Sequence, residues 1–267
     1  MPRSLAAFAF LLLLACVAAP CVAQAPPEQL QIMPPMRRIG PPPSSWTALQ
    51  LEKQGDDLRA DKAYVDALDY YRAALDRKPS AVLQNKIGIT YLQMQRFAEA
   101  SKAFQRSTRA DRNYADAHNN LGVIYYLQKK YGKAIKEYQK ALKLAAESAS
   151  FYSNLGAAYF SQKQFEKATV EYTRALQLDP DIFERTSHTG VAAQMSSPED
   201  RAHYDYVVAK MYARLGIAER SLLYLRKAME EGYKEIGKVY KDTEFAGLRK
   251  DPRFAELMAA KPAAIPE

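Results

Sequence analysis

Residues 149–180 read ASFYSNLGAAYFSQKQFEKATVEYTRALQLDP, and their pattern recurs through the middle of the 267-residue chain. A glycine returns every 33 or 34 residues, at Gly55, Gly88, Gly122 and Gly156. Twelve residues after each glycine stands an alanine, at Ala67, Ala100, Ala134 and Ala168. Self-similarity at a fixed period of this length predicts a solenoid, in which each unit packs only against its neighbours.

Each unit is predicted to form two helices. Around Gly122, apolar residues recur at helical spacing as far as Leu127 and again over 131–144, with a turn at 128–130. A glycine inside a helix costs about 1 kcal/mol relative to alanine, so we expect it to permit close approach of the paired helices. The aromatic residues that follow the alanines are expected to fill the space between one unit and the next: Tyr71, Phe104, Tyr138 and Tyr172.

These residues resemble the tetratricopeptide repeat family, whose pattern is most complete from Tyr152 to Pro180. The resemblance covers four units in phase, at 48–79, 81–112, 115–146 and 149–180. A fifth, degenerate unit carries Ala209 and Ser221 at the glycine and alanine positions. The resemblance implies an all-α fold, a right-handed α-solenoid of antiparallel helix pairs.

The predicted organisation follows from these units and their flanks. It comprises a signal peptide (1–23), a Pro-rich linker (24–45), four repeats (46–180), an insertion loop (181–201), the fifth repeat (202–231) and a C-terminal capping segment (232–267). A solenoid needs a terminal unit with one polar face, so we expect Phe245, Leu248, Phe254 and Leu257 to pack on the fifth pair. The insertion is either a surface loop or a segment folded over the groove.

The N-terminal segment predicts export. One basic residue, Arg3, precedes an apolar stretch and a small-residue end, which indicates a signal peptide cleaved after Ala23. Two alternatives stay open. The residues before Cys16 loosely resemble a bacterial lipobox, which would leave Cys16 acylated in a membrane. Residues 5–23 would also almost suffice to span a bilayer if they were not cleaved. We therefore expect a secreted or periplasmic protein, with membrane attachment only if it is lipidated or keeps its signal.

Composition excludes several classes of site. The only cysteines, Cys16 and Cys21, lie in the signal segment, so cleavage would leave no thiol for a disulfide or a metal. The net charge is +8, yet the basic residues are scattered among acids and form no recognition motif, so no nucleic-acid partner is expected. The histidines His118, His188 and His203 fit no metal or catalytic motif. We predict no enzyme activity, no cofactor and no metal, with His118 as a packing residue.

The remaining functional signal is the groove that the family resemblance implies along the first helices. The residues expected there are Asn85, Asn119, Asn120, Tyr126, Asn154 and Phe160. Asn120 and Asn154 occupy equivalent places, as in family members that hold extended peptides with a ladder of asparagines. A side-chain amide both donates and accepts hydrogen bonds, so it can pair with a peptide backbone. The alternative is that these asparagines merely tolerate exposure.

A carboxylate clamp of the kind that some relatives use is not matched, because Asp56, Ile89 and Val123 stand at its ninth positions. The sequence thus predicts a non-enzymatic protein–protein interaction scaffold of the bacterial cell envelope. Its partner would be an extended peptide or a protein bound in the concave groove. The alternative is a lipid-anchored assembly factor for a pilus or outer-membrane machine, carried on acylated Cys16.

Overall fold

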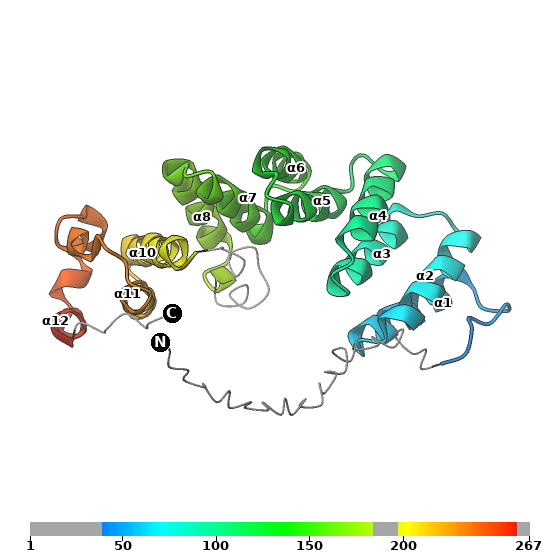
Figure 1. Cartoon of the computed structure of the whole chain (residues 1–267), viewed down its shortest axis with the longest axis horizontal. Helices are drawn as coiled ribbons and strands as arrows, with labels where there is room; N and C mark the ends of the chain where they lie inside the picture. Colours follow the sequence, from blue (N-terminus) through cyan, green and yellow to red (C-terminus); the bar gives the residue numbers. More distant parts are fainter. Residues whose placement is uncertain (1–38, 184–196, 261–267) are drawn as a thin grey trace, which may run out of the picture. The chain divides into compact units, whose positions relative to one another are not determined.

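The computed structural model describes residues 39–183 and 197–260, and within these ranges all regular structure is helical. The α-helices are α1 (Ala48–Ala60), α2 (Tyr64–Arg77), α3 (Ala81–Gln93), α4 (Phe97–Ala110), α5 (Ala115–Leu127), α6 (Tyr131–Leu144), α7 (Ala149–Ser161), α8 (Phe165–Leu178), α10 (Pro198–Arg214), α11 (Ala218–Glu230) and α12 (Pro252–Ala260). Three 3-10 helices precede α12: η2 (Ile236–Tyr240), η3 (Thr243–Ala246) and η4 (Leu248–Lys250). Successive α-helices up to α11 pack as antiparallel pairs (Figure 1). The predicted all-α fold of paired helices is therefore confirmed.

In each of the first four pairs, an aromatic side chain of the second helix packs tightly against the repeat glycine of the first helix. A Cβ added to Gly122 would lie 2.6 Å from Cε1 of Tyr138 on the partner helix. The same overlap recurs between Gly55 and Tyr71, Gly88 and Phe104, and Gly156 and Tyr172. Each aromatic ring therefore packs against the glycine of its own unit. The sequence pattern had suggested only that it fills the space between units. The alanines at positions 67, 100, 134 and 168 are fully buried, which keeps the paired backbones close.

The fifth pair reaches the same packing with different residues. Ala209 replaces the glycine, Leu225 replaces the aromatic residue, and both are fully buried. A leucine is smaller than an aromatic ring, so the extra methyl group of Ala209 finds room. The hydroxyl of Ser221 donates to the carbonyl oxygen of Ala209 at 2.7 Å and ties α11 to α10.

One turn geometry joins the two helices of every pair. The second residue after the end of the first helix adopts positive φ, at Lys62, Gln95, Lys129, Lys163 and Gly216. After α5, the amide of Lys130 donates to the carbonyl of Tyr125 at 2.8 Å, and that of Lys129 donates to Tyr126 at 2.7 Å. These two bonds form a Schellman motif, which satisfies the last carbonyls of the helix.

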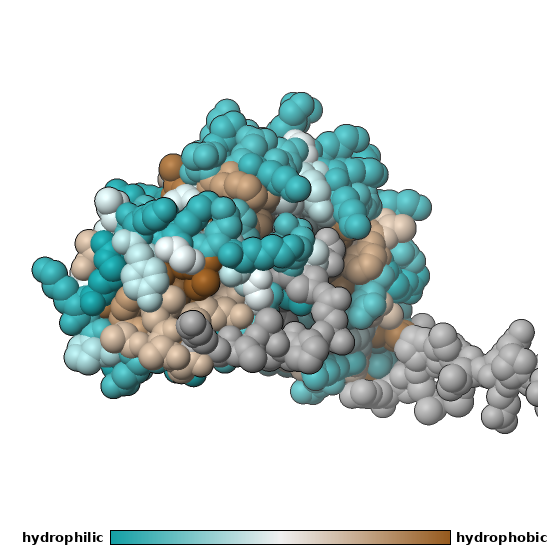
Figure 2. Space-filling model, turned by 60° about the vertical axis from the view of Figure 1, so that its left-hand side comes forward, coloured by the Kyte–Doolittle hydropathy of each residue, from teal (hydrophilic) through white to brown (hydrophobic). Residues whose placement is uncertain are grey.

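The first helices of neighbouring units touch one another, α3 with α5 and α5 with α7, so their side chains share one face. Each second helix packs against the first helix of the next unit. The surface visible in Figure 2 is largely hydrophilic, with apolar residues gathered in patches. No helix in the described part of the chain is long and apolar enough to cross a membrane.

The C-terminal segment packs as the sequence predicted. Phe245, Leu248, Phe254 and Leu257 are buried in one cluster with core residues of α10 and α11. Tyr206 of α10 contacts Phe245 directly, with ring centroids 5.6 Å apart. The predicted signal peptide, most of the linker and residues 184–196 of the insertion, including His188, lie outside the described residues.

Candidate functional site

Four asparagines form a continuous hydrogen-bonded row across α3, α5 and α7. Asn154 Nδ2 donates to Asn119 Oδ1 at 2.9 Å, and Asn119 Nδ2 donates to Asn120 Oδ1 at 3.3 Å. Asn120 Nδ2 then donates to Asn85 Oδ1 at 3.0 Å, and Asn85 Nδ2 donates to the hydroxyl of Tyr114 at 3.4 Å. Every amide donates to the next member in the same order, so the bonds polarise one another in the same sense. We call these four residues the asparagine row.

Burial divides the row into two kinds of residue. Asn85 and Asn119 are only 3% and 8% exposed, whereas Asn120 and Asn154 are half-buried and open to solvent. The buried pair therefore holds the exposed pair in place, and only the exposed pair can reach a ligand. The expectation that Asn85 and Asn119 flank a bound ligand does not fit this burial.

The two aromatic residues predicted for the groove are buried instead. Tyr126 is 5% exposed, and its hydroxyl lies 2.8 Å from Ser161 Oγ in the next unit. Phe160 is 2% exposed and packs edge-on against Phe165 at 5.1 Å. Burial raises the pKa of Tyr126 to about 12. Both rings therefore serve the packing of the repeats and offer little surface to a ligand.

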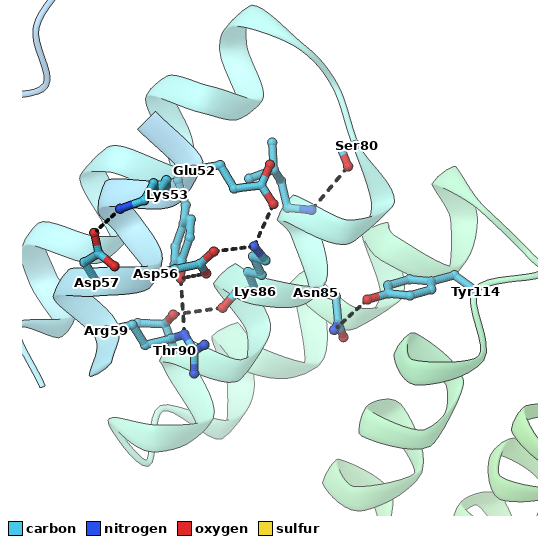
Figure 3. A network of polar contacts seen from close by, with 12 residues as sticks. Glu52, Lys53, Asp56, Asp57, Arg59, Ser80, Asn85, Lys86, Thr90 and Tyr114 are labelled. Carbon is cyan, nitrogen blue, oxygen red and sulfur yellow. Dashed lines mark hydrogen bonds and ion pairs between the residues drawn. The ribbon is translucent and has the colours of Figure 1, made fainter. Parts of the chain in front are cut away.

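An ion-paired cluster adjoins the row at α1 and α3. Lys86 Nζ lies 2.6 Å from Glu52 Oε1 and 2.6 Å from Asp56 Oδ2 (Figure 3). The Tyr71 hydroxyl also donates to Asp56 Oδ1 at 2.8 Å. Burial disfavours the charge of Lys86, but the bonds to Asp56 and Glu52 outweigh it and raise its pKa. With two carboxylates on its ammonium, Lys86 is poorly placed to clamp the carboxylate of a ligand.

His118 is a packing residue in the structure. Its Nδ1 lies 2.7 Å from Glu137 Oε2 and its Nε2 lies 3.1 Å from the carbonyl oxygen of Arg112. The residue is buried, and both ring nitrogens are occupied by the protein, so neither is available to a substrate. Among the residues that the structure describes, no group of three or more histidine, cysteine and acidic side chains is arranged to hold a metal ion.

A cavity of about 550 Å³ lies between α8, α10 and the C-terminal segment. Sequence reasoning missed it, because the groove positions were followed only through the four regular units. Asn119 and Asn120 stand three and two residues before Gly122, and the same offsets from Ala209, which replaces the glycine, point to Tyr206 and Val207. The α10 lining also includes His203, Lys210 and Arg214. The opposite wall includes Tyr233, Asp242 and Glu244 of the C-terminal segment, so this segment does more than cover the core.

Comparison with known families agrees with this geometry. Family models described as tetratricopeptide repeat match residues 85–149 and 149–182. Residues 85–182 thus match the tetratricopeptide repeat family over two adjoining stretches. The helix pairs α1–α2 and α10–α11 flank this stretch, and the first repeats the glycine–aromatic contact of the matched units. The asparagine row lies within the matched repeats.

Several solved structures resemble these repeats. A crystal structure of MamA is 21% identical, with a TM-score of 0.47, over 66% of this chain and 93% of that one. MamA of Desulfovibrio magneticus RS-1 is 18% identical, with a TM-score of 0.49, over 73% and 97%. YrrB, described as a TPR protein with an unusual peptide-binding site, is 19% identical, with a TM-score of 0.47, over 69% and 86%. No curated protein matches the chain.

Proposed function

We propose that this chain is a non-enzymatic scaffold that binds an extended polypeptide along α3, α5 and α7, with Asn120 and Asn154 pairing with the ligand backbone. Tetratricopeptide repeats are typically binding scaffolds. The contacts among the four asparagines make this stretch of the array the best candidate for the binding face.

The hydrogen bonding of the asparagine row carries the proposal. Inside the row, Asn120 donates one amide hydrogen and accepts one bond on its oxygen. Its NH2 group therefore keeps a second hydrogen, and its oxygen keeps a second lone pair. Asn154 uses one amide hydrogen in the row. The second hydrogen of Asn120 can be donated to the carbonyl oxygen of a bound peptide, and its second lone pair can accept from the peptide's N–H group. Because Asn119 and Asn85 already fix the amides, binding would lose little side-chain entropy.

The acidic residues beside the row narrow the class of ligand. Glu52 and Asp56 at the N-terminal side both pair with Lys86, so its ammonium is already occupied by carboxylates. A C-terminal carboxylate bound here would be repelled by Glu52 and Asp56, whereas an internal segment of a polypeptide carries no such charge. We therefore propose an internal extended segment as the ligand rather than a free C-terminus.

A peptide selection tests the proposal even while the partner is unidentified. Random linear peptides displayed on phage would be selected against the immobilised chain, and the enriched peptide would be titrated by calorimetry. Two lost hydrogen bonds of about 0.5–1.5 kcal/mol each weaken binding roughly five- to a hundredfold. We expect that loss in the Asn120→Ala/Asn154→Ala variant and none in Asn113→Ala, an exposed asparagine in the loop between α4 and α5. Equal affinity in the double variant would reject the asparagine row as the site.

We also propose that the scaffold acts in the cell envelope, since the apolar segment 5–23 with its small-residue end is typical of an export signal. Intact mass analysis of the mature protein tests this. A chain beginning at Gln24 supports cleavage, an acylated chain beginning at Cys16 supports the lipid-anchored alternative, and a full-length cytoplasmic chain contradicts export.

A further inference from the structure

The cavity between α8, α10 and the C-terminal segment is built from two unlike walls, and neither contains a residue of the asparagine row. One wall is a series of aromatic rings. His203 lies 4.4 Å from Phe165 and stacks on Tyr233 at 5.6 Å, and Tyr233 stacks on Tyr206 at 4.5 Å. Tyr206 is buried, whereas the other three rings are half-buried, and all four line the cavity. Burial lowers the pKa of His203, which favours a neutral ring at pH 7.

The other wall is acidic. Asp242 Oδ2 accepts from the Tyr206 hydroxyl at 2.9 Å and lies 2.9 Å from Lys210 Nζ. The same ammonium lies 3.4 Å from Glu244 Oε1. Lys210 therefore pairs with both carboxylates, and it contacts only one oxygen of each. Asp242 Oδ1 and Glu244 Oε2 have no protein partner among residues 39–183 and 197–260.

The lining as a whole holds three acidic and three basic side chains, but at Asp242 and Glu244 two carboxylates share the single ammonium of Lys210. Lys238 is paired with Glu235 at 2.8 Å, and Arg214 is exposed near the end of α10. Glu166 of α8 adds a further carboxylate to the lining. Burial, with smaller effects of the nearby Glu235 and Asp242, raises the pKa of Tyr233 to about 12, so its hydroxyl is neutral at pH 7.

We propose that this cavity binds the guanidinium group of an arginine residue in a polypeptide ligand. The planar cation would stack on the ring of Tyr233 and donate to the unpaired oxygens of Asp242 and Glu244. Aromatic faces attract cations, and a guanidinium adds a planar fork of donors that an ammonium lacks. Bidentate bonds from such a fork to carboxylates are among the stronger hydrogen bonds in proteins. This site extends recognition beyond the asparagine row and does not depend on it.

The test uses a small probe, so it stands apart from the peptide experiment. N-acetyl-arginine methylamide would be titrated into the full chain while NMR follows the aromatic signals of Tyr233 and His203. We expect saturable shifts with a Kd of about 1–10 mM, as suits a small ligand. The citrulline analogue has nearly the same shape without the charge and should bind at least about tenfold more weakly, because it loses the charge-assisted bonds. The lysine analogue should fall between the two.

Binding to substituted chains tests whether the probe occupies the cavity. Glu244→Gln should weaken binding severalfold, Glu256→Gln on the exposed face of α12 should not, and Asn120→Ala/Asn154→Ala should bind the probe like the unchanged chain. Should Glu244→Gln misfold, Tyr233→Leu removes the stacking surface instead. Equal binding of the citrulline analogue, unchanged binding in Glu244→Gln or Tyr233→Leu, or the absence of a saturable shift would overturn the proposal.

Discussion

At the scale of single residues, the fit between one glycine and one ring decides how closely two helices pair. A Cβ on Gly122 would approach Tyr138 to 2.6 Å, which no side-chain contact tolerates without a shift. Gly132 in the first turn of α6 is different, because the nearest atom to its added Cβ is 3.8 Å away. The two positions separate the effect of packing from that of helix propensity.

We predict that Gly122→Ala lowers the free energy of unfolding by about 1–3 kcal/mol, the usual cost of overpacking. Gly132→Ala should change it slightly in the stabilising direction, since alanine favours helix by up to about 1 kcal/mol. Urea denaturation followed by circular dichroism measures both. A Gly122→Ala variant as stable as Gly132→Ala would contradict the packing account.

The fifth pair suggests a rescue. Because Ala209 coexists with Leu225 there, Tyr138→Leu should make room for the methyl group of Gly122→Ala. The double variant should therefore lose less stability than the sum of the two single losses, and residues in contact commonly couple by about 0.5–3 kcal/mol. Strictly additive losses would show that the ring and the glycine do not restrain each other.

A buried acid predicts a pH dependence. Asp205 on α10 is 8% exposed, and burial, then repulsion from Glu231, raises its pKa to about 7 against the attraction of Lys227 and Arg201. The folded state therefore holds a proton that the unfolded chain releases near pH 4. Its stabilising effect is complete below about pH 4 and is lost as the pH rises through about 7.

Asp205→Asn keeps the shape and removes the titration. We expect its melting temperature to exceed that of the unchanged chain at pH 8, with the difference shrinking toward pH 5. Asp116→Asn, at an exposed position of α5, serves as the control. A difference that does not depend on pH would contradict the assignment to Asp205.

At the scale of elements, the turn after each first helix holds a residue with positive φ, and only the fifth of these five turns uses glycine. A left-handed conformation costs an L-residue roughly 1 kcal/mol, which glycine avoids. Lys129→Gly should therefore raise the free energy of unfolding by up to about 1 kcal/mol, whereas Gly216→Ala should lower it by a similar amount. Thermal unfolding of both variants checks the prediction, and shifts of the same sign would refute it.

Much of this element structure was predictable from sequence. The periodic glycine and alanine indicated the helix pairs, and the apolar pattern predicted the 131–144 helix at its observed bounds. The sequence pattern did not show how deeply each side chain is buried. Helical spacing places Asn85, Asn119, Tyr126 and Phe160 on one side of their helices, but how far neighbouring units cover them depends on packing between repeats. The positive φ of Lys129 was hidden because lysine carries no signal for it.

At the scale of the whole molecule, the C-terminal segment has two tasks. It covers the apolar face of α10 and α11, and it supplies a wall of the cavity proposed to bind arginine. The covering role was predictable from its apolar spacing. The cavity was not, since it requires Asp242 and Glu244 to meet Lys210 from far along the chain.

Removal of residues 242–267 tests the covering role. It would expose side chains such as Tyr206, which is buried now and contacts Phe245, so we expect a lower melting temperature and self-association. Light scattering and thermal unfolding follow both effects. A chain lacking only residues 261–267 is the control. Unchanged melting and a monomeric state in the longer truncation would show that the segment is not a cap.

The central claim concerns the backbone of a bound polypeptide, and a calorimetric cycle tests it most directly. In the selected peptide, single amides would be replaced in turn by esters, which removes one backbone donor and leaves the side chains unchanged. Each peptide would be titrated into the unchanged chain and into Asn120→Ala. We predict that one ester weakens binding to the unchanged chain by roughly two- to tenfold and has little effect on Asn120→Ala, since the hydrogen bond is already lost. Equal weakening of both proteins by every ester would contradict the account.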